Sequence, residues 1–266
     1  KFEKYIKIIL KTTIESMDDG LRISTITSVL KLSQIIELKK IYTNLPISKN
    51  YLPYIEYGCD NIPRGFSEKS LIKKRKKKKK KIFYNQATIH VIHDGKIMNV
   101  KLFNNGRIQI TGLKNENQAG KLVLKLLQYF KDFEVISDYT ELIENKIVLI
   151  NSDFDLGFEI NREELHYEII ENDIYSSYEP CIYPGVNIKY FINASQTNTC
   201  GICECENMCT GKGNGCGDGD CKKVTIAVFK SGKVIITGGQ NKDQIIESYR
   251  FITNFIQNKK EKFAFG

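Results

Sequence analysis

Apolar and polar residues alternate along two short stretches near the C-terminal end of the chain. The stretches are Val224–Phe229 and Lys233–Thr237, and Ser231-Gly232 lies between them. Alternation of this kind places successive side chains on opposite faces of a sheet. A glycine between two such strands supplies the positive φ of a tight turn. The pattern therefore predicts a β-hairpin that ends at Gly238.

The same segment occurs twice in the sequence. Phe103–Gln118 aligns without a gap with Phe229–Gln244, at an offset of 126 residues and with seven identities in sixteen positions. In the first copy the turn reads Asn105-Gly106, which is a strong hairpin signal. Internal repetition of this quality indicates two copies of one supersecondary unit.

Each predicted hairpin leads into a segment of helical periodicity. Asn115 and Asn241 are the expected N-caps, and Gln118 and Gln244 follow three residues later in capping-box spacing. Behind the caps, apolar residues recur at helical spacing, at Leu122, Leu126, Phe130 and Phe133 in the first copy and at Ile245, Tyr249, Ile252 and Ile256 in the second. Each helix therefore has an apolar face to pack on the back of its sheet.

The segments upstream of the hairpins complete the prediction for each half. Ile23–Leu32 is predicted to be a strand and Ile35–Leu45 a helix, and in the second half Lys146–Ile150 is a strand and Arg162–Glu171 a helix. Each half then runs strand, helix, strand, hairpin, helix. This order predicts an α+β fold with an antiparallel sheet.

Composition adds a class and an unusual segment. The 266 residues allow one large or two modest domains, and no apolar run is long enough to span a membrane. Lys73–Lys81 is nine consecutive basic residues, and without them the 40 Lys and Arg become 31, equal to the 31 Asp and Glu. The basic run is consistent with a solvated loop, a nuclear-localisation signal or a tether for phosphates, and these interpretations are compatible.

Six of the eight cysteines lie in a short glycine-rich segment, at Cys200, Cys203, Cys205, Cys209, Cys216 and Cys221. A CxxC pair followed closely by further cysteines is typical of structural zinc inside a cell. Six thiolates can bind one ion with two to spare or two ions with shared ligands. Disulfides and free thiols are the alternatives. We expect a structural zinc ion and not a catalytic one.

Two motifs of the second half resemble the TATA-box-binding protein (TBP) family. They are Ser176-Ser-Tyr-Glu-Pro followed by Tyr183-Pro-Gly, and Phe229-x-Ser-Gly-Lys-x-Ile-Ile-Thr-Gly. In the first half, Ile26–Leu32 followed by Glu37-Leu-Lys-Lys-Ile resembles the opening strand and helix of the family. With its insertions and its Lys-, Ile- and Asn-rich composition, the chain looks most like a divergent giant-virus member.

The resemblance implies a saddle: about ten antiparallel strands in two pseudo-symmetric repeats form a curved sheet with helices on the convex face. The expected organisation has an N-terminal extension at 1–20, a first repeat at 21–133 and a second at 134–262. The first repeat contains a basic insert at 46–82, and the second a Cys-rich insert at 193–223.

The resemblance further implies that the concave face binds the minor groove of DNA. A·T pairs offer only acceptors there, and G·C pairs add a protruding amine. A floor of apolar side chains with a few hydroxyl donors therefore selects A·T. Thr111 and Thr237 are expected to supply donors, Ile235 to contact bases, and Arg107 and Lys233 to reach phosphates.

Phe103 and Phe229 are, by the same resemblance, wedges that open base steps and kink the duplex. The family pairs each wedge with an aromatic on the preceding strand, and these positions fall at Tyr183 and at Phe83. Ordinary packing on the sheet is the alternative explanation for all four rings.

The sequence departs from the family on the floor. Where the family has an asparagine in each half, this chain has Thr25 and Leu149, and Asn151 lies two residues further on the same strand face. Lys101 and Gln109 replace residues that are usually apolar. A more polar floor weakens the exclusion of G·C, so bent, AT-rich binding is expected more firmly than strict TATA preference.

Three functions are compatible with these features. The first is a transcription initiation factor that bends AT-rich promoter DNA and recruits a TFIIB-like factor and the RNA polymerase machinery. The second is an architectural DNA-bending protein, and the third a saddle-fold nucleic-acid enzyme. Because the sequence contains no nucleophile motif and no phosphate-cradling loop, we expect no enzymatic activity and no small-molecule substrate. We expect no membrane partner, because no apolar run is long enough to span a membrane. The expected location is intracellular, in a nucleus or a cytoplasmic viral factory.

Overall fold

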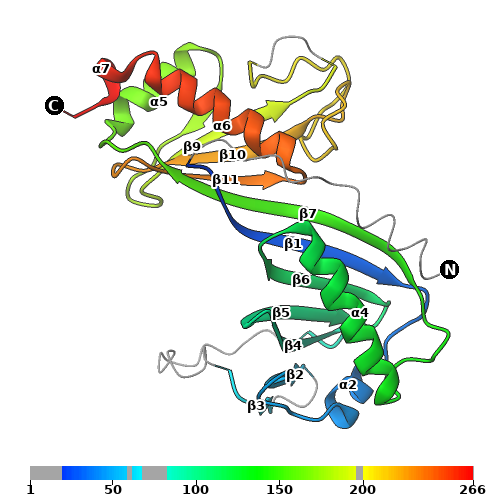
Figure 1. Cartoon of the computed structure of the whole chain (residues 1–266). Coiled ribbons are helices and arrows are strands. Elements are labelled where there is room, and N and C mark those ends of the chain that lie inside the picture. Colours follow the sequence, from blue (N-terminus) through cyan, green and yellow to red (C-terminus); the bar gives the residue numbers. More distant parts are fainter. Residues whose placement is uncertain (1–19, 59–61, 68–82, 196–199, 266) are drawn as a thin grey trace. The chain divides into compact units, whose positions relative to one another are not determined.

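The computed structural model describes residues 20–58, 62–67, 83–195 and 200–265 (Figure 1). Contacts divide them into two compact units, which we call the first half (residues 26–148) and the second half (residues 20–25 and 149–265). The division falls within two long strands, one at Arg22–Leu32 and one at Leu142–Asp155. The sequence had predicted a boundary at residue 134.

The described residues of the first half form strands and two helices. Its elements are β1 (Arg22–Leu32, which begins in the second half), α2 (Leu38–Asn44), β2 (Tyr54–Tyr57), β3 (Arg64–Gly65), β4 (Gln86–His93), β5 (Lys96–Phe103), β6 (Arg107–Leu113) and α4 (Glu116–Asp132). The second half repeats this plan with a further short helix. Its elements are β7 (Leu142–Asp155, which begins in the first half), α5 (Arg162–Glu171), β8 (Tyr175–Ser177), β9 (Val186–Ile192), β10 (Lys222–Val228), β11 (Lys233–Gly239), α6 (Lys242–Gln257) and α7 (Lys260–Phe263).

Among the described residues, eleven strands form one sheet in the order β3-β2-β4-β5-β6-β1-β7-β11-β10-β9-β8. The registered strand pairs are antiparallel. This confirms the predicted α+β class and comes close to the predicted ten strands. The first half holds β3 in addition, and the described residues of the second half form no counterpart to it.

In each half, one face of the sheet is packed against a long helix (Figure 1). Ile108 and Ile110 of β6 are fully buried on that side, together with Leu122, Leu126 and Phe130 of α4. In the second half Val234 and Ile236 of β11 are buried with Ile245, Ile252 and Ile256 of α6. The alternation read from the sequence thus gives each half a buried face and an opposite face, which we call the open face.

The helix caps are the same in the two halves. The Gln118 N–H donates to the Asn115 side chain at 3.0 Å, and the Gln244 N–H donates to the Asn241 side chain at 2.9 Å. Each glutamine side chain accepts from the backbone N–H of the residue before the cap, at 2.8 Å in both halves. The predicted asparagine caps are confirmed, and the glutamine of each predicted capping box bonds one residue earlier than the cap itself. Together these bonds fix where α4 and α6 begin.

The hairpin turns are also the same. Gly106 has φ +81° and Gly232 φ +79°. A Cβ on Gly106 would lie 2.2 Å from the carbonyl oxygen of Gln34, and one on Gly232 would lie 2.2 Å from that of Phe158. Both positions therefore need glycine for its backbone conformation and for the close approach of another strand end.

Some predicted elements differ in extent. The first helix begins at Leu38 and not at Ile35, because the Ile36 N–H bonds the carbonyl oxygen of Asn104 and holds the chain extended. Strands β2 and β3 lie inside the range that the sequence assigned to a basic insert. The run Lys73–Lys81 falls outside the described residues, as do residues 1–19. No helix in the described part of the chain is long and apolar enough to cross a membrane.

Candidate nucleic-acid interface

Strand pairing determines which side chains share the open face of the first half. Lys101 lies opposite Gln109, and Gln109 lies opposite Val29 on the next strand. Thr111 lies opposite Thr27, with the two hydroxyl oxygens 3.4 Å apart. Apart from this threonine pair, these side chains are only partly covered, so the open face presents an amide, an ammonium group and a valine side by side.

In the second half the open face is built from equivalent positions. Ile235, the counterpart of Gln109, lies between Ala227 and Asp153 and is 39% exposed. Thr237, the counterpart of Thr111, donates its hydroxyl proton to the Asn151 side chain. The predicted contacts Asn151, Ile235 and Thr237 therefore lie next to one another on this open face.

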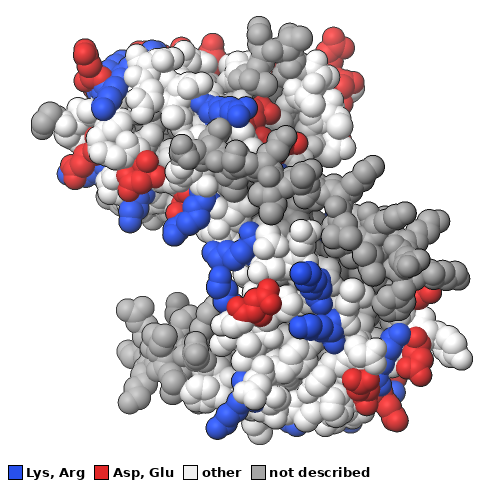
Figure 2. Space-filling model, in the orientation of Figure 1, with Lys and Arg blue, Asp and Glu red and all other residues white. Residues whose placement is uncertain are grey.

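Arg107 and Lys233 are exposed at the first position of β6 and β11, directly after the hairpin turns. This is where the sequence placed them. Figure 2 shows that Lys and Arg do not form a single basic sheet on the face it presents, but alternate with acidic and uncharged surface.

The aromatic pair of the second half is present. The ring centroids of Tyr183 and Phe229 lie 5.7 Å apart with a 59° angle between the planes. A Cβ on Gly185 would lie 3.0 Å from the Tyr183 ring and 3.2 Å from the Phe229 ring. The glycine of the Tyr-Pro-Gly motif therefore makes room for both rings, and Tyr183 stays 37% exposed.

The first half has a different arrangement around its wedge candidate. Phe103 is half-buried, and no ring contact joins it to another aromatic within the described residues. Tyr183 lies three residues before Val186, which is the strand partner of Val228. In the first half, Leu102 is equivalent to Val228, and its strand partner Ala87 lies three residues after Tyr84. The register thus makes Tyr84 the counterpart of Tyr183, while the sequence suggested its neighbour Phe83; both are exposed.

An ion pair on the second-half open face was not foreseen. Arg22 donates to Asp153 Oδ2 from Nη2 at 2.5 Å and from Nε at 3.2 Å. The Ser24 hydroxyl donates to the other carboxylate oxygen. The partners are 131 residues apart in sequence, so only the fold brings them together.

Thr25 and Leu149, which stand where the family has asparagines, do not reproduce that polar pair. Leu149 is half-buried on β7. Thr25 Oγ1 is buried and has no hydrogen-bond partner within the described part of the chain. A buried hydroxyl without a partner costs free energy, which a donor or acceptor on a ligand can recover.

Four of the six insert cysteines form a cluster. The sulfur atoms of Cys203, Cys205, Cys209 and Cys221 all lie within 4.8 Å of one another, and Cys221 Sγ is 3.9 Å from Cys203 Sγ and 3.2 Å from Cys205 Sγ. Tetrahedral zinc with four thiolates needs sulfur separations of about 3.8 Å. The donor set and its spacing therefore fit one metal ion.

The remaining two cysteines lie outside the cluster. Cys200 is half-buried and Cys216 is exposed. The spacing along the sequence allowed several sets of four ligands, and the fold selects one of them. Cys200 and Cys216 thus correspond to the two spare thiols of the one-ion alternative.

The polypeptide around the cluster is suited to holding thiolates. Backbone N–H groups of Gly211 and Cys221 bond the Cys209 sulfur and counter the effect of burial, which leaves the pKa of that thiol lowered. Burial and the neighbouring thiols raise the pKa of Cys221. Without a metal the buried Cys221 therefore keeps its proton, whereas a bound cation would displace it.

The insert is fastened to the hairpin of β9 and β10. The Phe191 N–H bonds the carbonyl oxygen of Gly201, and the Lys223 N–H bonds that of Gly211. A Cβ on Gly211 would lie 2.8 Å from the Phe191 ring, which belongs to the open face. The cysteine cluster is therefore held directly beside the end of the open face.

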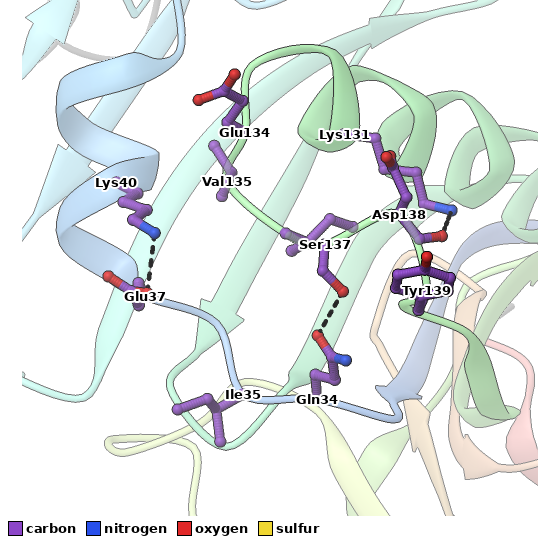
Figure 3. A pocket seen from close by; sticks show the side chains of 11 residues that line it. Gln34, Ile35, Glu37, Lys40, Lys131, Glu134, Val135, Ser137, Asp138 and Tyr139 are labelled. Atoms are coloured by element: carbon purple, nitrogen blue, oxygen red, sulfur yellow. Dashed lines mark hydrogen bonds and ion pairs between the residues drawn. The ribbon is translucent and has the colours of Figure 1, made fainter.

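A separate hollow of about 690 Å³ lies in the first half between the ends of α2 and α4 (Figure 3). Its charged groups are engaged locally, because Lys40 pairs with Glu37 at 3.0 Å and Lys131 donates to the Asp138 carbonyl oxygen at 2.6 Å. The Ser137 hydroxyl donates to Gln34. The arrangement ties two loops together, and none of the predicted site residues lines it.

Comparisons of the sequence and of the structure with known proteins lead to the same group of relatives. Residues 144–259 match the sequence model of the family described as transcription factor TFIID, or TATA-binding protein, TBP. The chain is 28% identical over 281 aligned positions to the TATA-box-binding protein-like protein of Acanthamoeba polyphaga mimivirus, covering 98% of this chain and 71% of that protein. It is 24% identical to the TATA-box-binding protein of Methanococcus aeolicus, over 61% of this chain and 70% of that one.

The fold is shared with a solved structure. The TBP of Methanococcus jannaschii superposes with a TM-score of 0.53 at 18% identity, covering 90% of this chain and 99% of that one. At this identity the likeness establishes the TBP-like fold alone. Together with the match of residues 144–259 and the viral relative, it agrees with what the motifs indicated: the chain is similar in sequence and in fold to TBP-like proteins.

Proposed function

We propose that this chain is a transcription initiation factor that binds AT-rich promoter DNA through the minor groove and bends it. The observation that supports this most strongly is the second-half open face, where the Tyr183–Phe229 ring pair lies at the turn end of the strands that carry Ile235 and Thr237. Paired rings at the edge of an apolar floor can enter a base step, and the floor then covers the opened groove.

The rest of the predicted interface is proposed for the same task. Arg107 and Lys233 contact phosphates, and Thr111 hydrogen-bonds base edges. Asn151, which accepts the hydroxyl proton of Thr237, donates its amide protons to base acceptors. Phe103 is the first-half wedge, with Tyr84 or Phe83 beside it. This is a binding function with no chemical step, carried out inside the cell in a nucleus or a viral factory.

Bending measured by energy transfer between dyes on the two duplex ends tests the proposal. Phe229→Ala and Phe103→Ala should remove most of the bend, while binding at low salt weakens only about tenfold, because the cations that contact phosphates remain. Tyr167→Ala, which removes a 62% exposed ring from α5, is the matched control and should change neither quantity. If bending and binding are both lost in proportion to a fall in the melting temperature of the protein, the rings are ordinary core residues.

The cysteine cluster is proposed to hold one structural zinc ion on Cys203, Cys205, Cys209 and Cys221. The protein purified without chelators should contain about one zinc per chain. Cys221→Ser should lose it, whereas Cys216→Ser, which alters an exposed thiol outside the cluster, should retain it. A zinc content below about half an equivalent in the unaltered protein would remove the metal from the proposal.

The insert is further proposed as a docking element for a TFIIB-like factor, as the family resemblance implies for this loop. Met208 is 93% exposed between Cys205 and Cys209, so the cluster presents an apolar side chain to the solvent. Met208→Glu should weaken capture of such a factor on DNA without loss of zinc or of bending. Unchanged capture by this variant would place the docking surface elsewhere.

The principal alternative is an architectural protein that bends DNA without an initiation role. Equal bending of random and AT-rich duplexes, together with no capture of a TFIIB-like factor, would favour it. No observation on the open faces favours the enzyme hypothesis.

A further inference from the structure

The duplication provides an internal comparison of base-contacting positions. Within the two hairpins, Lys101 lies opposite Gln109, and Ala227 lies opposite Ile235. These are equivalent places in the repeated segment, so the backbone presents the four side chains in the same way. The two halves therefore offer different chemistry on equivalent frameworks.

The first-half position carries an amide with unused hydrogen-bonding capacity. Gln109 is half-buried between Lys101 and Val29, and neither Gln109 nor Lys101 has a side-chain hydrogen bond or ion pair within the described part of the chain. An amide offers two donor protons and an acceptor oxygen. When another molecule covers this face and excludes water, these groups must find partners on it or remain unpaired.

The second-half position offers no comparable acceptor. Ile235 and Ala227 are apolar. The nearby carboxylate of Asp153 receives bonds from Arg22 and Ser24, so its acceptor capacity is largely taken up. Arg22 is 75% exposed and presents further donor protons. Apolar surface with donors matches A·T pairs, whose minor-groove edges carry only acceptors.

A G·C pair differs from an A·T pair in the minor groove by the guanine N2 amine, which is a donor. Against Ile235 and Ala227 this amine would lose its water and gain no partner. Against Gln109 the amide oxygen can accept from the amine while the amide nitrogen donates to the neighbouring base acceptor. The first half can therefore accept a G·C pair at a position where the second half disfavours it.

We infer that Gln109 is a specificity-determining residue that admits a G·C pair under the first half, whereas Ile235 restricts the second half to A·T. The DNA site of this protein is then asymmetric, with one strictly A·T half and one half that accepts the minor-groove amine. This inference rests on the proposed minor-groove binding.

A single base analogue tests it. 2,6-Diaminopurine in place of one adenine adds only the N2 amine to an A·T pair, and it can be placed at each position of a bound duplex in turn. The unaltered protein should tolerate the analogue within about twofold at one end of the site and lose about tenfold in affinity at the other, which is the cost of one unpaired contact.

Exchanging the two side chains assigns each end to a half. Gln109→Ile should extend the tenfold penalty to the tolerant end, and Ile235→Gln should reduce it at the strict end. Both positions are partly exposed on strands, and the reciprocal variant keeps the test valid if one of the two fails to fold. The double exchange should reverse the profile.

Two results would overturn the inference, and they differ in what else they affect. Equal penalties at both ends in the unaltered protein, with bending intact, would remove the role of Gln109 and leave the proposed function standing. No penalty at any position would show that the minor groove is not contacted, and the proposed function would fail with the inference.

Discussion

The two halves of this protein agree in their backbone and disagree on their open faces. The caps agree to within about 0.1 Å in hydrogen-bond length and the turn glycines to about 2° in φ, and the helix faces are buried in both halves. On the open faces, by contrast, Gln109 stands where Ile235 does, and Val29 where Asp153 does. Capping hydrogen bonds, backbone conformation and core packing constrain the first set of residues, while the second set faces outward and can follow a ligand.

The halves also differ in what has been added to them. The second half holds a cysteine cluster in the loop between β9 and β10, and α7 packed near α5. The first half holds β3 instead. Additions occur at loops and edges, where they disturb neither the sheet register nor the core. The repeated frame is thus separable from the features that give each half its own chemistry.

The largest expected effect tests the shared frame. Gly106→Ala and Gly232→Ala should each lower the free energy of unfolding by about 3 kcal/mol, because each combines a positive φ with a Cβ 2.2 Å from a carbonyl oxygen. Gly95→Ala is the control: it has φ +70° with open space around the Cβ, and should cost only about 1 kcal/mol. Urea unfolding measures all three. If the losses in free energy of unfolding caused by Gly106→Ala and by Gly232→Ala differ by more than about 2 kcal/mol, the two halves are not equivalent.

A smaller effect concerns the helix caps. Asn115→Ala and Asn241→Ala should each cost about 1 kcal/mol, since each removes the acceptor for one N–H of the first helical turn. Equal losses in urea unfolding would extend the equivalence of the halves to α4 and α6. Asn117→Ala, at an exposed position in the first turn of α4, leaves the cap in place and serves for comparison. A negligible loss for only one of the two caps would show that its helix is fixed by packing alone.

The smallest effect belongs to the second half alone and depends on pH. Glu168 accepts hydrogen bonds from Lys259 and from Lys262, the latter at 2.5 Å, and these bonds lower its pKa to about 2 from the ordinary 4.5. A lowered carboxyl pKa stabilises the fold above the unfolded-state pKa, and this contribution is lost as the pH falls from about 4.5 towards about 2. Glu168→Gln should therefore flatten the acid side of the stability profile. Glu163→Gln, at an exposed site on the same helix, should leave the profile unchanged.

Much of the frame could be predicted from the sequence because it rests on local patterns. The Asn-Gly and Ser-Gly turns, the asparagine caps and the alternation of Ile110 with Thr111 are each read over a few residues. Strand β2 escaped prediction because it is only four residues long, follows Pro53 and lies in a segment dominated by its charge. Its place in the sheet depends on pairing with β4, which no local pattern specifies.

The candidate site was predictable in kind but not in detail. The sequence placed Phe229, Tyr183 and Thr237 in one neighbourhood through motif and alternation. It could not choose four cysteines among six, because ligand selection follows from the path of the insert. It could not distinguish Phe83 from Tyr84, because that depends on strand register. The ion pair of Arg22 with Asp153 required the fold itself.

The central claim, that the open faces bind and bend DNA, is tested most directly by selecting bound sites from random duplexes and measuring the bend of each selected site. The account predicts AT-rich sites that are bent, with G·C pairs admitted at one end. Selected sites without A·T enrichment, or AT-rich sites that remain straight when bound, would contradict it.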